Sequence, residues 1–207
     1  MEKTSRKNKN ISNKIHRYKV LLTLLVIVLI ALIAVFVNRV IEYNSADREA
    51  RDMLKLMAEL KETDNDVDIN LNDTKIKGYQ VIGSIKIDSI ELEYPILEKT
   101  TTESLNLSIT KFSGPELNGY GNVTLAGHNN RNGKLFSKLI YVKFQDIIEV
   151  TDMESNTVKY KVNNIYTVDP TDISCTNTDN ENIKELTLIT CTSGGAKRLV
   201  IKASEII

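Results

Sequence analysis

The chain has 207 residues, two cysteines and a balanced formal charge of 27 basic against 27 acidic side chains. This length has room for one medium-sized domain and an anchor, and it excludes two large folds. The balance hides a basic tail, because residues 1–19 contain a single acid, Glu2, and the basic residues Lys3, Arg6, Lys7, Lys9, Lys14, Arg17 and Lys19. The position of this tail before an apolar run indicates a membrane flank, so we expect no nucleic-acid partner.

Residues 20–37, VLLTLLVIVLIALIAVFV, form an apolar run in which only Thr23 is polar. As a helix it would span about 27 Å, close to the thickness of a bilayer core. A cleaved signal peptide would have a shorter apolar region followed by a small-x-small site, and residues 38–42, NRVIE, offer none. We therefore expect a transmembrane signal anchor at 20–37, with residues 1–19 in the cytoplasm and everything after residue 38 outside the cell.

Residues 38–74 are expected to form a helical stalk and a linker. Apolar residues recur at three- and four-residue steps, which predicts a helix with one apolar stripe, made of Ala46, Ala50, Met53, Leu54, Met57 and Leu60. This helix either packs against the following domain or forms a partly ordered stalk, and the pattern favours neither. Residues 63–73, TDNDVDINLND, are typical of a solvated linker and lack the spacing of a calcium-binding EF-hand loop.

Residues 75–207 consist of short β-like runs separated by turn residues. Strands are predicted at 79–87, 90–97, 123–126, 146–151, 157–168, 185–191 and 198–203. Residues 113–121 are a dense turn cluster, and residues 135–139 could make one helical turn. About eight short strands with little helix predict a mostly β domain of about 130 residues, built as a closed barrel or a sandwich.

Three residues at predicted strand ends could carry chemistry. His128 follows the apolar run 123–126 in a Gly-His-Asn turn, Cys191 ends the run LTLITC, and Arg198 begins the next run seven residues later. If those last two strands pair, the guanidinium of Arg198 lies near the thiol. A structural histidine and a buried cysteine that acts as a small hydrophobe are the alternatives.

These three residue types suit cysteine catalysis. The thiolate is the reactive form, and a free cysteine has a pKa of about 8.5, so a neighbouring cation or imidazole must help it to ionise. His128 could exchange protons with the thiol and with a leaving amine. Arg198 stays protonated and cannot act as a base, but it could donate hydrogen bonds to an oxyanion or to the substrate backbone.

The runs VTLAGHNN and TLITCTSGGAKRLVI resemble the signature of the sortase family, a strand ending in His, a TLxTC strand and an Arg on the next strand. The resemblance covers about residues 75–207 and implies an eight-stranded β-barrel, preceded here by the membrane helix. It also implies a cysteine transpeptidase with Cys191 as nucleophile, His128 as acid and base, and Arg198 as the residue that holds the oxyanion or the substrate.

The same resemblance implies the substrates and partners. Sortases cleave an LPxTG-like sorting signal between Thr and Gly through a thioacyl intermediate. They then pass the acyl group to an amine, commonly of a peptidoglycan precursor or a pilin lysine. The expected partners are therefore surface proteins of a Gram-positive cell that carry C-terminal sorting signals, together with the amine acceptor and the membrane. No cofactor and no metal is expected.

The class within the family depends on the segment before LTLITC. It is too short for the long helix of class B and looks closer to class D-like sortases. Its acids, Asp169, Asp172, Asp179 and Glu181, lie where some class A members bind calcium, but they are interpreted as carboxylates on a solvated loop. Cys175 is expected to be free or only transiently oxidised, because a bridge to Cys191 would abolish the nucleophile.

Two alternatives to a sortase remain open at this point. One is an extracytoplasmic cysteine peptidase that uses the same three residues with water as the acceptor. The other is a non-catalytic, membrane-tethered β-domain.

Overall fold

The computed structural model describes residues 2–63, 75–130 and 133–206. The chain divides into two compact units, residues 1–45 and 46–207, and each is described by itself. Apart from Thr63, the predicted linker lies outside the described residues.

Helix α1, Glu2–Thr63, is continuous and joins the two helices that the sequence predicts separately. No glycine or proline occurs between residues 2 and 63, so nothing in the sequence breaks the helix. Among the residues that the structure describes, the stretch His16–Ile41 is the one helical segment long and apolar enough to cross a membrane. Its mean hydropathy is 3.5, and none of its apolar window is buried by protein, which fits a surface made for lipid.

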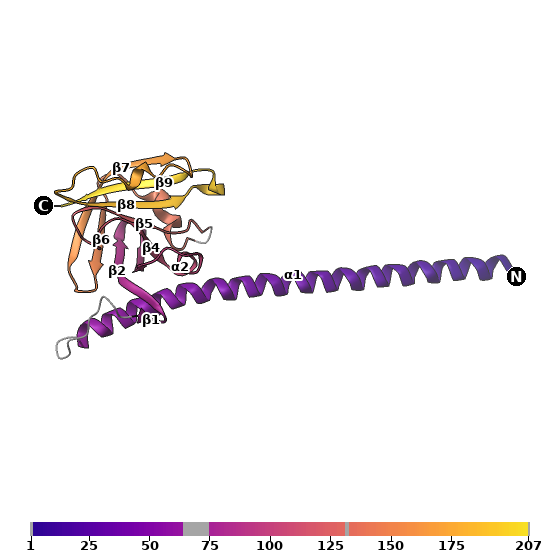
Figure 1. The fold of residues 1–207 in the computed structure, drawn as a ribbon. Coiled ribbons are helices and arrows are strands. Elements are labelled where there is room, and N and C mark those ends of the chain that lie inside the picture. Colours follow the sequence, from indigo (N-terminus) through magenta and orange to yellow (C-terminus); the bar gives the residue numbers. More distant parts are fainter. Residues whose placement is uncertain (1, 64–74, 131–132, 207) are drawn as a thin grey trace. The chain divides into compact units, whose positions relative to one another are not determined.

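The second unit contains a closed β-barrel (Figure 1). Its strands are β1 Lys75–Ile76, β2 Tyr79–Ile87, β3 Leu92–Leu97, β4 Ile109–Ser113, β5 Gly121–Ala126, β6 Ile147–Asp152, β7 Thr157–Val168, β8 Lys184–Cys191 and β9 Arg198–Glu205. They pair in the order β1-β2-β3-β4-β5-β8-β9-β7-β6, and β2 also pairs with β6. That last pairing closes β2 to β9 into an eight-stranded barrel, and β1 is a two-residue strand paired antiparallel with the start of β2. The predicted eight-stranded, mostly β fold is confirmed.

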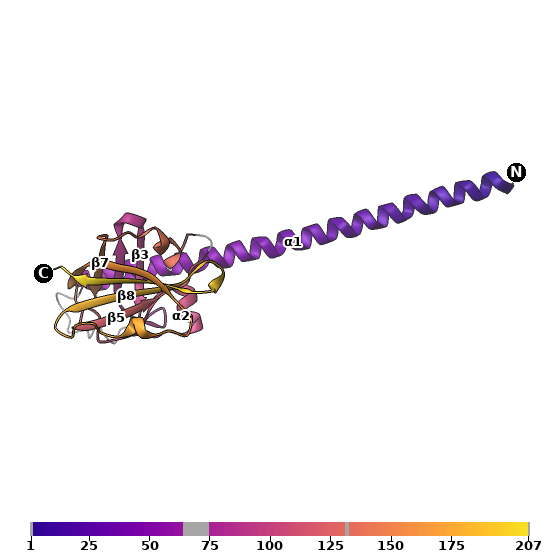
Figure 2. The same ribbon diagram turned by 90° about the horizontal axis from the view of Figure 1, so that it is seen from above.

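Two parallel pairings set the geometry of the barrel. Strand β3 pairs with β4 and β5 pairs with β8 in parallel, whereas the other pairs are antiparallel. The run β5, β8 and β9 forms one wall, as the view from above shows (Figure 2). Because parallel neighbours end at the same edge of a sheet, whatever follows β5 lies beside whatever follows β8.

The barrel interior is filled by alternate residues of the strands. Leu125 of β5, Leu188 of β8 and Ile201 of β9 are fully buried there, together with Phe136 and Tyr160. This alternation is the period-two pattern that the sequence shows in these segments. The interior therefore provides a rigid scaffold under the strand ends.

The apolar stripe of α1 packs against the barrel. Met53 and Met57 are buried in a second cluster with Val81, Leu97 and Met153. Each buried methionine contributes about 1.5–3 kcal/mol of hydrophobic stabilisation. Of the two alternatives for this helix, packing is right for the segment around Met53 and Met57, and a free stalk is wrong.

Five short elements connect the strands. They are η2 Asp88–Ile90, α2 Thr102–Leu107, η3 Phe136–Tyr141, η4 Ser174–Thr176 and η5 Ser193–Gly195. Helix α2 begins with a capping box between Thr101 and Ser104 and carries the crossover between the parallel strands β3 and β4. The sequence prediction placed no element at α2 or β4, and it placed a helical turn where η3 lies. Segment 169–183, all of it described, holds only the short η4, in agreement with the expected lack of a long helix.

Candidate active site

Cys191 and Arg198 face each other across a tight turn. Cys191 is the last residue of β8, Arg198 is the first residue of β9, and the two are partners in the antiparallel register. Nη1 of Arg198 donates a hydrogen bond to Sγ of Cys191 at 3.2 Å. Within the turn, the N–H of Thr192 donates to the carbonyl of Lys197 at 2.9 Å. The predicted proximity of guanidinium and thiol is therefore present.

His128 reaches the same edge through the parallel pairing of β5 with β8. Ala126 is the register partner of Ile189, so His128, two residues beyond Ala126, lies level with the end of β8. The side-chain amide of Asn129 donates to the carbonyl of Cys191 at 2.7 Å. His128 lines one pocket together with Cys191 and Arg198. The structure thus brings together all three residues that the sequence singled out.

Gly127 allows this close approach. A Cβ at this position would lie 2.7 Å from Cδ1 of Ile109 and 2.8 Å from Cδ2 of Phe136. The Thr190 hydroxyl also donates to the Gly127 carbonyl at 2.7 Å. Because residue 127 is glycine, the segment before His128 packs directly on the core. This packing fixes the position of His128 relative to the end of the barrel.

The pocket has a volume of about 310 Å³ and mostly apolar walls. Its apolar lining includes Leu105, Phe112, Val168 and Ile173. Such a pocket suits apolar side chains of an extended ligand, whereas the thiol, imidazole and guanidinium supply polar groups. The arrangement can bring a peptide carbonyl to Cys191 with a cation beside it.

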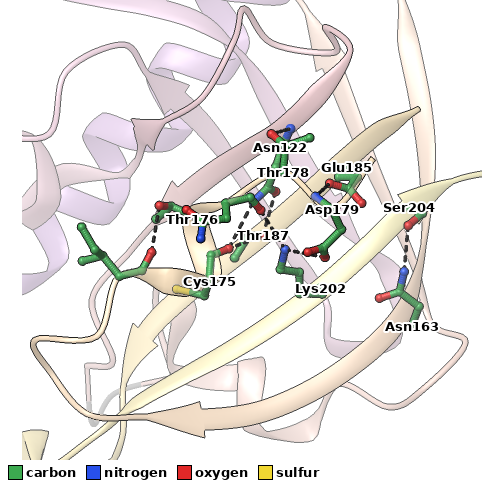
Figure 3. Close-up of polar contacts among 12 residues, drawn as sticks. Asn122, Asn163, Cys175, Thr176, Thr178, Asp179, Glu185, Thr187, Lys202 and Ser204 are labelled. Atoms are coloured by element: carbon green, nitrogen blue, oxygen red, sulfur yellow. Dashed lines mark hydrogen bonds and ion pairs between the residues drawn. The ribbon is translucent and has the colours of Figure 1, made fainter. Parts of the chain in front are cut away.

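One wall of the pocket belongs to segment 169–183, which a buried polar network holds in place (Figure 3). The side-chain amide of Asn122 donates to the carbonyls of Cys175 at 3.1 Å and Asn177 at 3.0 Å. Its oxygen accepts from the hydroxyl of Thr187 on β8 at 2.8 Å. Lys202 on β9 donates to the same Asn177 carbonyl and lies 3.0 Å from the carboxylate of Asp179. The segment is therefore fastened to the β5–β8–β9 wall.

Both cysteines are free, as expected from the sequence. The carbonyl of Cys175 lies over Thr187, four residues before Cys191 in the strand. Burial, with a smaller effect from the charge of Asp172, raises the pKa of the Cys175 thiol. Cys175 thus stays protonated, whereas Cys191 is the thiol with a cationic partner.

The sequence prediction missed the polar network and Asn129. The only local signals for the network are a polar residue at the start of the 121–126 strand and a lysine inside the apolar run RLVIKA. Lys202 is only 9 % exposed. A lysine inside a buried strand needs a partner, and that partner here is the Asp179 carboxylate on a loop 23 residues away. Among the described residues, no group of three or more His, Cys, Asp or Glu is arranged to hold a metal ion.

We expect Asn122→Ala to lower the free energy of unfolding by about 2 kcal/mol, because it removes two hydrogen bonds to carbonyls of segment 169–183, those of Cys175 and Asn177. Limited proteolysis should then cut this segment faster than in the wild type. Asn163→Ala is the matched control, since Asn163 is exposed and its amide bonds only the Ser204 hydroxyl, at 2.7 Å (Figure 3). Equal proteolysis of the two variants would show that the network does not hold the wall.

Comparisons with known proteins agree with this geometry. A family model described as the sortase domain matches residues 85–206. Sortase A of Listeria monocytogenes is 36% identical over 112 residues, which are 54% of this chain and 49% of that protein. The chain thus spans about half the length of that curated relative.

Solved structures show the same likeness. Sortase A from Corynebacterium diphtheriae superposes with a TM-score of 0.58 at 32% identity, covering 62% of this chain and 62% of that one. A sortase D5 transpeptidase of Clostridium perfringens gives a TM-score of 0.61 at 25% identity and covers 78% of this chain and 98% of that one. Because sortases of classes A and D both match, the class D-like assignment stays a prediction.

Proposed function

Because the chain belongs to the sortase family, we propose that it is a membrane-anchored cysteine transpeptidase. Its substrate would be a protein with an LPxTG-like sorting signal, and its product that protein joined to an amine of the cell wall. One observation carries the proposal: the guanidinium of Arg198 lies 3.2 Å from the sulfur of Cys191, in a pocket that His128 also lines.

The first half of the reaction would form a thioester. The Cys191 thiolate attacks the carbonyl carbon of the scissile Thr–Gly bond and a C–S bond forms. The carbonyl oxygen becomes an oxyanion, to which Arg198 donates a hydrogen bond in place of its bond to the sulfur. The C–N bond then breaks as His128 gives a proton to the leaving amine.

The second half would transfer the acyl group. An acceptor amine attacks the thioester, His128 takes its proton, and the Cys191 thiolate leaves. The turn of residues 192–197 is short, and Gly194, Gly195, Ala196 and Lys197 in it are exposed, so the thioester would be open to an incoming amine.

The apolar walls of the pocket support a substrate with apolar residues near the scissile bond. In the proposed complex Leu105, Phe112 and Ile173, which line the pocket, would contact the Leu and Pro of the signal. Phe112 is 47% exposed and Ile173 is 64% exposed. Both side chains therefore have surface free to be covered by a bound peptide.

We place the enzyme in the cell membrane as a single-pass protein. The apolar stretch His16–Ile41 supports the span, and the basic residues before it support a cytoplasmic N-terminus. Residues 1–19 would be the cytoplasmic tail, 20–37 the anchor, 38–74 the stalk and linker, and 75–207 the catalytic domain outside the cell.

The proposal is tested with the full chain and an LPxTG-like peptide, with and without a short glycine peptide as amine. We expect cleavage between Thr and Gly in both cases, and accumulation of the ligated peptide when the amine is present. Cleavage without any ligated product would instead indicate the peptidase alternative, and no cleavage would favour the non-catalytic domain.

A further inference from the structure

Asp47, near the start of the α1 segment that belongs to the second unit, has a carboxylate with three partners. Oδ2 of Asp47 accepts a hydrogen bond from Nη2 of Arg51 at 2.7 Å and lies 3.4 Å from Nζ of Lys134. Oδ1 accepts from the hydroxyl of Tyr94, on β3, at 3.1 Å. The side chain of Asp47 is only 12% exposed, whereas the acidic side chains of the other ion pairs on this helix are largely exposed. The Asp47 carboxylate is therefore held in a defined, partly buried position.

Two of these partners, Lys134 and Tyr94, connect Asp47 to the loop that carries His128. Lys134 is in the loop, and the backbone of the next residue, Leu135, lies beside the hydroxyl of Tyr94. Leu135 forms a β-bridge with Asn129, and the N–H of Phe136 donates to the carbonyl of His128 at 3.0 Å. The two ends of the loop are thus tied together, with His128 at one end and the Tyr94 contact at the other.

The contacted end of the loop is strained. Leu135 has φ 53° and ψ −130°, a conformation that residues with a side chain rarely adopt. Such a backbone costs about 1–3 kcal/mol and persists only where the surroundings hold it. Here its side chain is buried in the core and its backbone lies beside the Tyr94 hydroxyl. Loss of the Tyr94 contact would let this end of the loop relax.

Near neutral pH the contact between Tyr94 and Asp47 has one protonation state, with the Tyr94 hydroxyl protonated and the Asp47 carboxylate ionised. Burial, the largest cause, raises the pKa of Tyr94 to about 12, so its hydroxyl keeps the proton that it donates to Asp47. Burial also acts to raise the pKa of Asp47, but the hydrogen bonds from Arg51 and Tyr94 and the charge of Lys134 outweigh it, and the pKa lies below its ordinary value. The stabilisation is therefore complete above about pH 4 and is lost as the pH falls below that.

We propose that Asp47 and Tyr94 are positioning residues for the reaction: through Lys134 and Leu135, and through the bridge from Leu135 to Asn129, they hold His128 in the place that proton transfer to and from the substrate requires. This inference rests on the proposed function. It makes the turn of α1 that carries Asp47 part of the active-site framework, because the carboxylate that holds Lys134 and Tyr94 comes from that turn.

The test uses Asp47→Asn and Tyr94→Phe in the full chain in detergent micelles. Each is expected to lower kcat for the LPxTG-like peptide about tenfold, with KM within about twofold, because a small misplacement of a catalytic group acts on the chemical step. The double variant should lose little more than either single one, since both changes break one connection. Asp47→Glu should recover part of kcat.

Asp52→Asn is the control. Asp52 lies on the same helix in an exposed ion pair with Lys77 at 3.0 Å, and its loss should leave kcat unchanged. A second readout needs no peptide: the pH profile of Cys191 alkylation by iodoacetamide should shift in Asp47→Asn and Tyr94→Phe but not in Asp52→Asn.

The outcomes separate this inference from the proposed function. Variants that melt at lower temperature but keep the wild-type kcat and alkylation profile would overturn the positioning role. A wild-type chain that does not cleave the peptide would overturn the proposed function. The alkylation profiles would still decide whether Asp47 and Tyr94 act on the site.

Discussion

Replacing Cys191 with alanine is expected to abolish peptide turnover, with a loss of about 10⁴-fold or more, and to leave the fold intact. The large loss follows because the other thiol that lines the pocket, Cys175, is buried and has a raised pKa, so the remaining groups then act on a substrate that cannot form a thioester. Chromatography of the peptide products measures the loss.

The fold should survive because the backbone contacts of Cys191 do not depend on its thiol. The amide of Asn129 still donates to its carbonyl, and the register with Arg198 is made by main-chain atoms. The melting temperature of Cys191→Ala should therefore lie within a few degrees of the wild-type value.

Cys175→Ala is the matched control, because Cys175 is the other cysteine of the chain. Its side chain is buried, so the change should cost about 1 kcal/mol of stability through the cavity it leaves. It should nevertheless keep turnover and a single alkylatable thiol at Cys191. Loss of turnover in Cys175→Ala together with its survival in Cys191→Ala would reverse the assignment of the nucleophile.

Replacing Arg198 with alanine is the second large change, and we expect kcat to fall about 10²–10³-fold. That is the effect of removing one donor to a developing oxyanion in a protected site. Arg198→Lys should restore only a small part, because an ammonium on a flexible stem does not reproduce the planar fork that now reaches the sulfur at 3.2 Å. Steady-state kinetics with the peptide would separate kcat from KM.

Lys197→Met is the control for this change. Lys197 precedes Arg198 and is exposed, and its nearest acid, Asp169, is 4.0 Å away. Removing its charge should alter kcat by less than about twofold. An Arg198→Ala variant with the activity of Lys197→Met would show that the guanidinium has no part in the reaction.

Local patterns in the sequence predict most of the barrel. Strands β2 and β7 begin and end where the alternation of apolar residues places them, and the ends of β8 and β9 differ by at most two residues from the prediction. Strand β4 escaped prediction because it has five residues and pairs in parallel with β3 through a crossover, which no local pattern shows.

The site likewise combines a local feature that the sequence predicts with long-range contacts that it does not. The turn between β8 and β9 is local, so the approach of Arg198 to Cys191 could be expected from the sequence. The approach of His128 depends on the parallel pairing of β5 with β8, which no local pattern in the sequence shows. The contact of Asp47 with Tyr94 joins residues 47 positions apart and depends on how α1 packs, which the apolar stripe left open.

The central claim is that Cys191 carries the acyl group, and one measurement tests it directly. The full chain is mixed with an LPxTG-like peptide without an amine, quenched in acid and analysed by intact and peptide mass spectrometry. The account predicts an added mass equal to the acyl fragment that ends in Thr, located on Cys191, removed by hydroxylamine and absent from Cys191→Ala. Cleaved peptide in the presence of unmodified Cys191, or an adduct on another residue, would contradict it.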